Sequence, residues 1–144
     1  MENPKLPKVE PVPPKMEKRL GKGLLLVPSP KEVEAAIREV PAGRVITVSR
    51  IREQLASKHM ADVTCPLTTG MFVRLAAEAA EEDARAGAAE ITPYWRVVKD
   101  DGSLNPKFPG GVRRQAARLR AEGLRLIPAR QGQPPRLAAT ELRR

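Results

Sequence analysis

The stretch Ile91–Gly123, ITPYWRVVKDDGSLNPKFPGGVRRQAARLRAEG, decides the fold. Its first part, Ile91–Val98, is rich in β-branched and aromatic residues, which favour a strand. The polar, glycine-containing segment 100–103 predicts a tight turn. Gly110-Gly111 opens a helix that is expected to end at Gly123, and one face of this helix is apolar: Val112, Ala116 and Leu119. The stretch therefore predicts a strand, a turn, a loop and a basic helix.

Three helices are expected before this stretch. The first begins at Ser29-Pro30-Lys31-Glu32, because Ser29 can cap it and Glu32 lies three residues after the cap. Apolar residues at helical spacing predict two more helices, over about residues 49–58 and 66–86. Two helices joined by a short connection and followed by a strand and wing are typical of a helix-turn-helix arrangement. Residues 24–27 and 124–127 are expected to form short extended segments.

The two ends of the chain differ in composition from its middle. Residues 1–23 are rich in Pro and Lys, which predicts a disordered tail. Residues 128–144 contain Pro134-Pro135 and scattered Arg, and a flexible basic tail is expected there. One mainly α-helical domain, with a winged helix-turn-helix and a short strand element, is therefore expected over residues 24–127.

The charge is distributed unevenly along the chain. Of the formal net charge of +9, residues 110–144 contribute +7, from nine Arg and two Glu, whereas residues 24–109 contribute −1. A nearly neutral middle followed by a basic end favours a polyanionic partner such as DNA. The alternative is a basic chain that its charge keeps soluble.

Cysteine usage and hydropathy exclude several classes of protein. A single cysteine, Cys65, cannot form an internal disulfide and fits a reducing cytoplasm. No apolar run approaches the roughly 20 residues of a membrane span. One Cys and one His, His59, make a structural zinc site improbable, so no metal and no cofactor is expected. A cytoplasmic monomer without membrane attachment is the expectation.

Residues 31–126 resemble the O6-alkylguanine-DNA alkyltransferases, which are suicide DNA-repair proteins. The family carries Pro-Cys-His-Arg-Val, a wing, Gly-Gly and a helix that ends in Glu-Gly, and the matching residues here are Pro93, Arg96, Val97, Val98, Gly110, Gly111, Glu122 and Gly123. Upstream, Pro41, Gly43 and Val45 match the family's Pro-x-Gly-x-Val. The resemblance implies the DNA-binding domain that forms the carboxy-terminal part of these proteins.

The family's reactive pair is missing from this chain. Tyr94 and Trp95 occupy the positions of the acceptor Cys and its neighbouring His. A thiol nucleophile needs a base, and a phenol with a pKa of about 10 is a poor substitute. The chain is therefore closer to the alkyltransferase-like proteins, which lack the acceptor Cys and bind alkylated DNA without repairing it. This resemblance implies no catalytic residue, and it implies a non-enzymatic DNA-binding protein that senses alkylated or damaged bases, with a repair protein as a further partner.

Several residues are candidates for contact with double-stranded DNA. Tyr94 or Trp95 could stack on an extruded base, the alternative being that they fill the core. Backbone N–H groups at the start of the third helix, with the Thr68 and Thr69 hydroxyls, could hold a phosphate. Gly70 within that helix indicates either a close backbone approach or a contact with a neighbouring helix.

Basic side chains add further candidates. Arg114 and Arg118 lie four residues apart on one helix face and could bind successive phosphates, the alternative being a solvated arginine face. Further candidate contacts are Arg74, Lys99, Lys107 and Arg113. Arg96 is a candidate too, but a role in bracing the strand and wing is favoured, and Glu122 is expected to accept a hydrogen bond from the Trp95 N–H. Cys65 is expected to be buried and inert.

Two other functions stay open at this point. One is an enzyme of unknown reaction whose pocket would include Cys65, Thr68, Thr69 and Tyr94. The other is a protein-interaction module that has lost its affinity for DNA and works through its Pro-rich amino-terminal segment.

Overall fold

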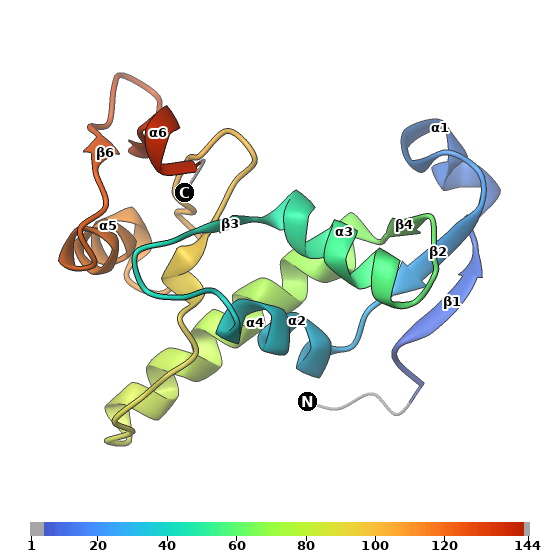
Figure 1. Cartoon of the computed structure of the whole chain (residues 1–144), viewed down its shortest axis with the longest axis horizontal. Helices are drawn as coiled ribbons and strands as arrows, with labels where there is room; N and C mark the ends of the chain where they lie inside the picture. Colours follow the sequence, from blue (N-terminus) through green and yellow to red (C-terminus); the bar gives the residue numbers. More distant parts are fainter. Residues whose placement is uncertain (1–4, 143–144) are drawn as a thin grey trace.

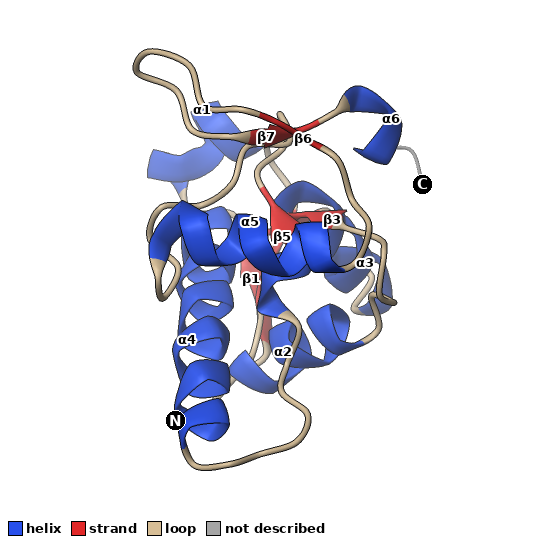
Figure 2. Ribbon diagram, turned by 90° about the vertical axis from the view of Figure 1, so that its left-hand side faces the viewer, coloured by secondary structure: helices blue, strands red, loops and turns tan. Residues whose placement is uncertain are grey.

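The long helix α4 (Pro66–Arg85) contributes to the main hydrophobic core through Val73, Ala76, Ala77 and Ala80. The computed structural model describes residues 5–142. Helices α2 (Pro30–Arg38) and α3 (Val48–Lys58) pack on α4 and on each other (Figures 1 and 2). Helix α5 (Gly111–Ala121) packs on the Tyr94–Arg96 segment and reaches α4 through Arg114 and Arg118. The predicted mainly α-helical fold with a helix-turn-helix, formed by α3 and α4, is therefore confirmed.

Local sequence signals set the helix boundaries. At the start of α2, the Ser29 hydroxyl accepts the Glu32 N–H at 3.2 Å while the Ser29 N–H donates to the Glu32 carboxylate at 3.3 Å, so the predicted capping box is confirmed. The Thr47 side chain caps α3 by accepting the Arg50 N–H at 3.1 Å. Gly123, with φ 88°, follows α5 and takes a left-handed conformation that favours glycine.

Three small sheets connect the helices. The largest has the order β1 (Lys8–Pro11), β2 (Leu24–Val27) and β4 (Val63–Thr64), with β1 antiparallel and β4 parallel to β2. Strands β3 (Ile46–Thr47) and β5 (Val97–Val98) pair in parallel, which joins the entry to α3 to the segment after Trp95. Strands β6 (Leu126–Ile127) and β7 (Arg136–Leu137) form an antiparallel pair beside α6 (Ala139–Leu142).

The core is built around α4 from aliphatic residues and three of the four aromatic ones. Its largest fully buried side chains include Tyr94, Leu26, Ile37, Ile51, Leu104 and Leu119. A second, smaller cluster joins Val12, Leu25 and Cys65. This second cluster ties the amino-terminal segment to β2 and to the start of α4.

The expectation of disordered tails needs correction on both sides. Within residues 5–23, β1 pairs with β2 and Val12 is buried, and a short 3₁₀ helix (Pro14–Met16) precedes α1 (Glu17–Leu20). After residue 127, Leu137 is buried and β7 completes a strand pair. The composition of these segments is low in apolar residues, but Val12 and Leu137 are placed where they reach the core. Residues 1–4 and 143–144 lie outside the described part.

The predicted strand Ile91–Val98 is shorter than expected. Only Val97 and Val98 form β5, whereas Tyr94–Arg96 form a 3₁₀ turn, η2, that follows Pro93. In this turn Tyr94 and Trp95 do not alternate across a sheet, and both are buried. Tertiary packing of the two rings thus overrides the local β-propensity of the segment. None of the helices in residues 5–142 is long and apolar enough to cross a membrane.

Candidate nucleic-acid interface

A groove runs between the first half of α4 and the loop that follows β5. Its volume is about 460 Å³, and its lining comes from α4 and the loop: Pro66, Leu67, Gly70, Met71, Arg74, Lys99, Asn105, Pro106 and Lys107. Three of these nine residues are basic and none is acidic. A groove of this composition offers positive charge to an anion without a competing carboxylate in its walls.

The charged and apolar groups of this groove are accessible. Arg74, Lys99 and Lys107 are exposed, and none of them forms an ion pair with another described residue. Between them lie two apolar side chains of α4, Leu67 and Met71, which are 74% and 48% exposed. Leu67 and Met71 are four residues apart and thus neighbours on one helix face. The sequence singled out Arg74, Lys99 and Lys107 but missed Leu67 and Met71, whose exposure only the packing of α4 reveals.

Gly70 lies at the centre of this helix face. A Cβ atom built on Gly70 would meet no other atom within 4 Å, and the residue is exposed. The alternative that Gly70 packs against a neighbouring helix is therefore wrong. Glycine inside a helix costs about 1 kcal/mol relative to alanine, and no contact within the described residues offsets that cost.

The expected phosphate site at the Thr68 and Thr69 hydroxyls is not formed. Thr69 is fully buried, and its hydroxyl donates to the Cys65 carbonyl at 2.7 Å. The Thr68 hydroxyl donates to the Cys65 Sγ at 3.3 Å. Both hydroxyls therefore donate hydrogen bonds to Cys65 at the start of α4. Thr69 has no exposed surface through which it could contact a ligand.

Hydrogen bonds to the core fix the loop on the other side of the groove. The Asn105 N–H donates to the Gln115 Oε1 at 2.9 Å, and the Asn105 side chain accepts the Lys107 N–H at 2.9 Å. Gln115 is fully buried and also donates to the carbonyls of Trp95 and Val97. Gln115 thus joins α5, β5 and the loop, a role that its place in a basic helix did not reveal.

The base of the loop is anchored to α3. Ser49 donates to the Asp100 carboxylate through its hydroxyl at 2.5 Å and its N–H at 3.2 Å. Asp101 accepts the Ser103 N–H at 2.9 Å, which holds the predicted turn, and this hydrogen bond keeps the pKa of Asp101 below its usual value. The wing is therefore held at both of its ends, by α3 and by α5.

A buried carboxylate, Glu81, organises the segment that replaces the reactive pair. Tyr94 donates its hydroxyl to Glu81 at 2.5 Å, and Arg118 and Arg114 reach the same carboxylate at 2.9 Å and 3.1 Å. Burial alone opposes the charge of Glu81, but the hydrogen bond from Tyr94 and the two arginines outweigh it, so the pKa of Glu81 lies below its usual value. Sequence patterning gave no sign of this role, because Glu81 lies among other acidic residues near the end of α4.

Tyr94 is a structural residue in this arrangement. Its side chain has no exposed surface, and its ring makes edge contacts with Trp95 and Phe108 at centroid distances of 5.4 Å and 5.3 Å. The expectation that Tyr94 stacks on an extruded base therefore needs correction. Burial raises the pKa of Tyr94, and the neighbouring Glu81 charge raises it further, so the nucleophilic phenolate form is strongly disfavoured.

Glu122 holds a second buried network, on the other side of Trp95. It accepts the Trp95 Nε1–H at 2.8 Å, the Arg96 guanidinium at 2.8 Å and the Gly43 N–H at 3.0 Å. Burial opposes the charge of Glu122, and these donors outweigh it, so its pKa is lowered. Arg96 also donates to the Val40 carbonyl at 2.6 Å. The predicted Glu122–Trp95 hydrogen bond agrees with this geometry, whereas the hydrogen bonds of Arg96 brace the segment before β5 against Val40 and Glu122 and do not reach the wing.

Trp95 and the arginines of α5 differ in how far their side chains are buried. Trp95 is buried, with the Arg118 guanidinium 4.4 Å from its ring centroid and Arg96 at 5.5 Å. Only 8% of Trp95 is therefore accessible to a base, which corrects that expectation too. Arg114 and Arg118 are engaged with Glu81, whereas Arg113 is exposed and forms no ion pair with another described residue.

The residues of the hypothetical enzyme pocket lie apart. Cys65 is buried against Val12 and Leu25 in the small cluster, whereas Tyr94 belongs to the main core with Phe108. The Cys65 thiol faces the Thr68 hydroxyl and has no base beside it in the contacts described. A shared pocket around Cys65, Thr68, Thr69 and Tyr94 is therefore not formed.

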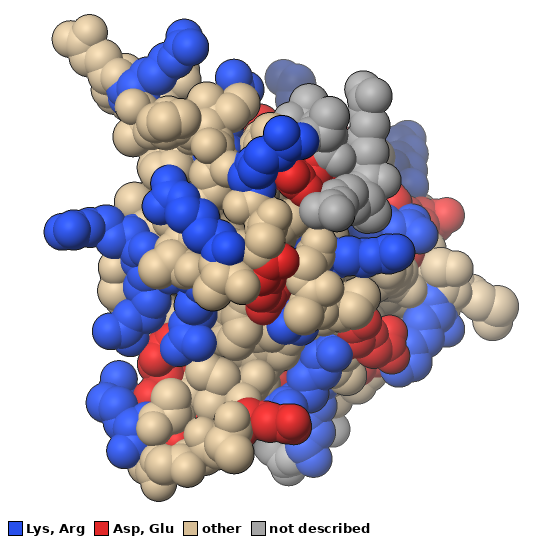
Figure 3. All heavy atoms as spheres, turned by 60° about the vertical axis from the view of Figure 1, so that its left-hand side comes forward, with Lys and Arg blue, Asp and Glu red and all other residues tan. Residues whose placement is uncertain are grey.

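The surface charge supports a basic face that includes α5. Figure 3 shows the molecule from the side where α5 lies, and Lys and Arg side chains outnumber Asp and Glu over much of this face. The exposed arginines of α5 include Arg113, Arg114 and Arg120. Their charge adds to that of the groove at longer range.

A helix-turn-helix whose second helix lines a basic groove against a wing defines a DNA-binding class of fold. Residues 28–124 match the family "6-O-methylguanine DNA methyltransferase, DNA binding domain". This match covers about two thirds of the chain, and the protein belongs to that family. No curated protein sequence matches the chain.

Two solved structures are similar to this fold. One is S. pombe Atl1 in complex with damaged DNA containing O6-carboxymethylguanine, with a TM-score of 0.54, 19% identity, and coverage of 78% of this chain and 91% of the other. The second is S. pombe ATL in complex with DNA, with a TM-score of 0.55 and the same identity and coverage. At this identity the likeness bears on the fold.

Proposed function

We propose that this protein binds double-stranded DNA without modifying it and recognises alkylated bases as a sensor of damage. The observation that carries the proposal is the groove beside α4, whose walls hold Arg74, Lys99 and Lys107 and no carboxylate. The second helix of a helix-turn-helix is the one that enters the DNA groove, and here that helix is α4. The family of the chain and the DNA complexes of its structural neighbours support the same proposal.

The groove suits an extruded base better than the buried centre does. Its volume of about 460 Å³ lies within the range of small-molecule sites, about 300–1,000 Å³. Leu67 and Met71 offer apolar contact to a base, and the basic side chains surround them. Behind Gly70 only a small cavity of about 40 Å³ remains, with Phe108 in its wall. A base would therefore rest on the outer groove instead of entering the core.

Alkyl transfer is not part of this proposal. The fully buried Tyr94 hydroxyl donates to Glu81, and its raised pKa disfavours the phenolate that an alkyl acceptor would need. Glu122 accepts a hydrogen bond from Trp95, whose indole N–H cannot take up a proton, so this carboxylate has no base to activate. Noncovalent binding is what these residues support.

Binding to a duplex is expected to depend steeply on salt. If the three groove cations each neutralise a phosphate, the logarithm of the association constant falls with a slope of about −2.7 against log salt, or about fortyfold between about 50 and 200 mM. Fluorescence anisotropy with a labelled duplex measures this slope. A slope near zero would contradict the proposed phosphate contacts.

A duplex containing O6-methylguanine is expected to bind about fivefold to tenfold more tightly than the unmodified duplex, because a poorly paired base costs less to extrude. The comparison uses the same sequence with guanine at that position. If both duplexes bind with equal affinity and the salt slope is retained, the proposed recognition of damaged bases is contradicted. The protein would then be a general DNA-binding protein.

Gly70→Ala is expected to stabilise the protein and weaken its binding to DNA. The added Cβ meets no atom of the described chain, and alanine favours a helix by about 1 kcal/mol. The same methyl group would project into the groove where DNA is expected to approach. Thermal unfolding and anisotropy measure the two effects. A more stable variant with unchanged affinity would show that DNA does not approach Gly70.

The remaining features of the proposal concern the protein's context. We place the protein in the cytoplasm as a monomer, and we expect a bound lesion to be passed to another repair protein. Exposed Arg113 remains a candidate phosphate contact at the start of α5. We also propose that residues 24–127 form one domain, and that the flanking segments described above pack onto it.

A further inference from the structure

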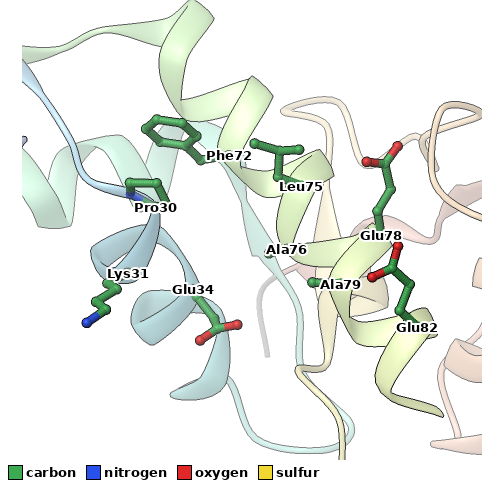
Figure 4. A pocket seen from close by; sticks show the side chains of 9 residues that line it. All are labelled: Pro30, Lys31, Glu34, Phe72, Leu75, Ala76, Glu78, Ala79 and Glu82. Carbon is green, nitrogen blue, oxygen red and sulfur yellow. The ribbon is translucent and has the colours of Figure 1, made fainter. Parts of the chain in front are cut away.

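A second groove lies between α2 and the later half of α4, and its chemistry is the opposite of that of the first. Its volume is about 420 Å³. Its floor is apolar and comes mainly from α4, with Phe72, Leu75, Ala76 and Ala79 (Figure 4). Phe72 and Leu75 are only partly buried, so their side chains are available to a ligand.

The rim of this groove is acidic. Glu34 of α2 and Glu78 and Glu82 of α4 border the apolar floor, and Figure 4 shows the last two projecting from the same side of α4. Glu34 is engaged with Arg38 at 3.6 Å and with the Thr92 hydroxyl at 3.3 Å. Glu78 and Glu82 are exposed and form no ion pair with another described residue.

This groove stands out because the chain as a whole carries a formal charge of +9. Three Glu and one Lys line it, which makes it locally negative. A phosphate backbone would be repelled there, so the groove does not extend the DNA interface. On α4 it begins at Phe72, and Glu78 and Glu82 lie about 6–12 Å along the axis beyond Arg74, the last α4 residue of the basic groove, at about 1.5 Å per residue.

We infer that the α2–α4 groove docks a segment of a partner protein that carries apolar side chains flanked by Lys or Arg. The apolar floor between two helices accepts the apolar face of an amphipathic helix, which is a common mode of peptide recognition. The unpaired carboxylates of Glu78 and Glu82 select the charge of the residues beside that face. This inference goes beyond DNA binding and does not depend on it, because the linings of the two grooves share no residue and carry opposite charge.

The test uses the full chain, labelled with ¹⁵N, and two synthetic peptides of about 14 residues. One peptide has Leu at helical spacing and Lys elsewhere, and the matched peptide has Glu in place of Lys. Chemical-shift perturbation locates binding and measures its strength without DNA. The Leu/Lys peptide is expected to perturb residues of α2 and of α4 from Phe72 to Glu82, and the Leu/Glu peptide is expected to leave these residues unperturbed.

Two pairs of substitutions sharpen the test. Glu78→Gln with Glu82→Gln is expected to weaken the Leu/Lys peptide about fivefold, since each exposed charge pair contributes modestly. Glu39→Gln with Glu90→Gln removes the same charge from exposed residues outside the groove and is expected to leave the affinity unchanged. Both pairs are exposed, so the fold should tolerate them.

The inference is overturned if the Leu/Lys peptide does not bind, if it binds elsewhere, or if the two pairs of substitutions act alike. It is also overturned if light scattering shows that the protein self-associates and that Glu78→Gln with Glu82→Gln abolishes this association, because the occupant would then be a second copy of the chain. Failure of DNA binding would leave these peptide results unaffected, so the two proposals are tested separately.

Discussion

Glu122→Ala should lower the melting temperature by about 10 °C, the largest effect on stability that we expect from a single substitution. Glu122 and Arg96 are 13% and 14% exposed, and Glu122 accepts hydrogen bonds from Arg96, Trp95 and Gly43. Removing one partner of a buried ion pair leaves the other charge uncompensated and costs about 3–5 kcal/mol. For a chain of this size, about 3 kcal/mol corresponds to roughly 10 °C. Thermal unfolding followed by circular dichroism measures the shift.

The matched control is Glu39→Ala, because Glu39 is exposed and forms no ion pair with another described residue. Its melting temperature should change little. A drop of less than about 3 °C for Glu122→Ala would show that the Glu122 network does not hold α5 and the loop before β3 together.

Acid should reveal the same network in the wild type. The pKa of Glu122 is lowered from a value of 4.5, so its stabilisation is fully present above that pH and is lost as the pH falls through the lower, folded-state pKa. The lowered pKa of Glu81 acts in the same direction. The free energy of unfolding of a Glu122→Gln variant should therefore fall less between pH 5 and 3 than that of the wild type, as chemical denaturation at each pH will measure.

The largest expected effect on function is that of a triple variant of the basic groove. Arg74→Ala, Lys99→Ala and Lys107→Ala together should weaken binding to duplex DNA about 100-fold at roughly 0.15 M salt, since three phosphate contacts are lost. The salt slope should decrease in magnitude by about three, or one for each side chain. Anisotropy titrations at several salt concentrations measure both quantities.

The control must remove the same charge elsewhere. Arg85, Arg120 and Arg130 are exposed and do not line the groove, so replacing all three with Ala changes the net charge equally. The control should retain most of the affinity, because distant charges act only through a screened field. If the two triple variants bind equally weakly, the interaction depends on net charge and the groove is not the interface.

Sequence patterns predicted the helices well because their signals are local. The capping box at Ser29, the proline at the first position of α4 and the glycine after α5 each act within a few residues, and the structure places helix boundaries close to them. The resemblance carried by Ile91–Gly123 likewise led to the family that the chain belongs to.

What the sequence could not reveal depends on contacts between distant residues. Glu81 lies in a run of acidic residues that is typical of a solvated helix end, yet Tyr94, Arg114 and Arg118 converge on it from 13 to 37 residues away. Arg114 and Arg118 were predicted to bind phosphates because their spacing puts them on one helix face. Spacing does not show whether that face contacts solvent or another part of the protein. The same limit hid the exposure of Leu67 and the burial of Thr69, two residues apart on one helix.

The paired segment at the amino terminus was missed for another reason. Residues 7–14 contain four prolines and only two apolar residues, Val9 and Val12, and such a composition favours an open chain. Their order comes from β2, whose partner edge they cover, and from the burial of Val12 beside Cys65. Composition alone cannot show that a neighbouring strand offers an unpaired edge.

Helix α4 contributes to the walls of both grooves, so binding in one groove can be coupled to binding in the other. A rigid helix that shifts when one site is filled changes the geometry of the other, and linkage requires the coupling to be reciprocal. If bound DNA changes the affinity of the α2–α4 groove for its ligand by some factor, then a ligand in that groove must change the affinity for DNA by the same factor. Through α4, a partner protein that binds the α2–α4 groove would then distinguish the DNA-bound protein from the free protein.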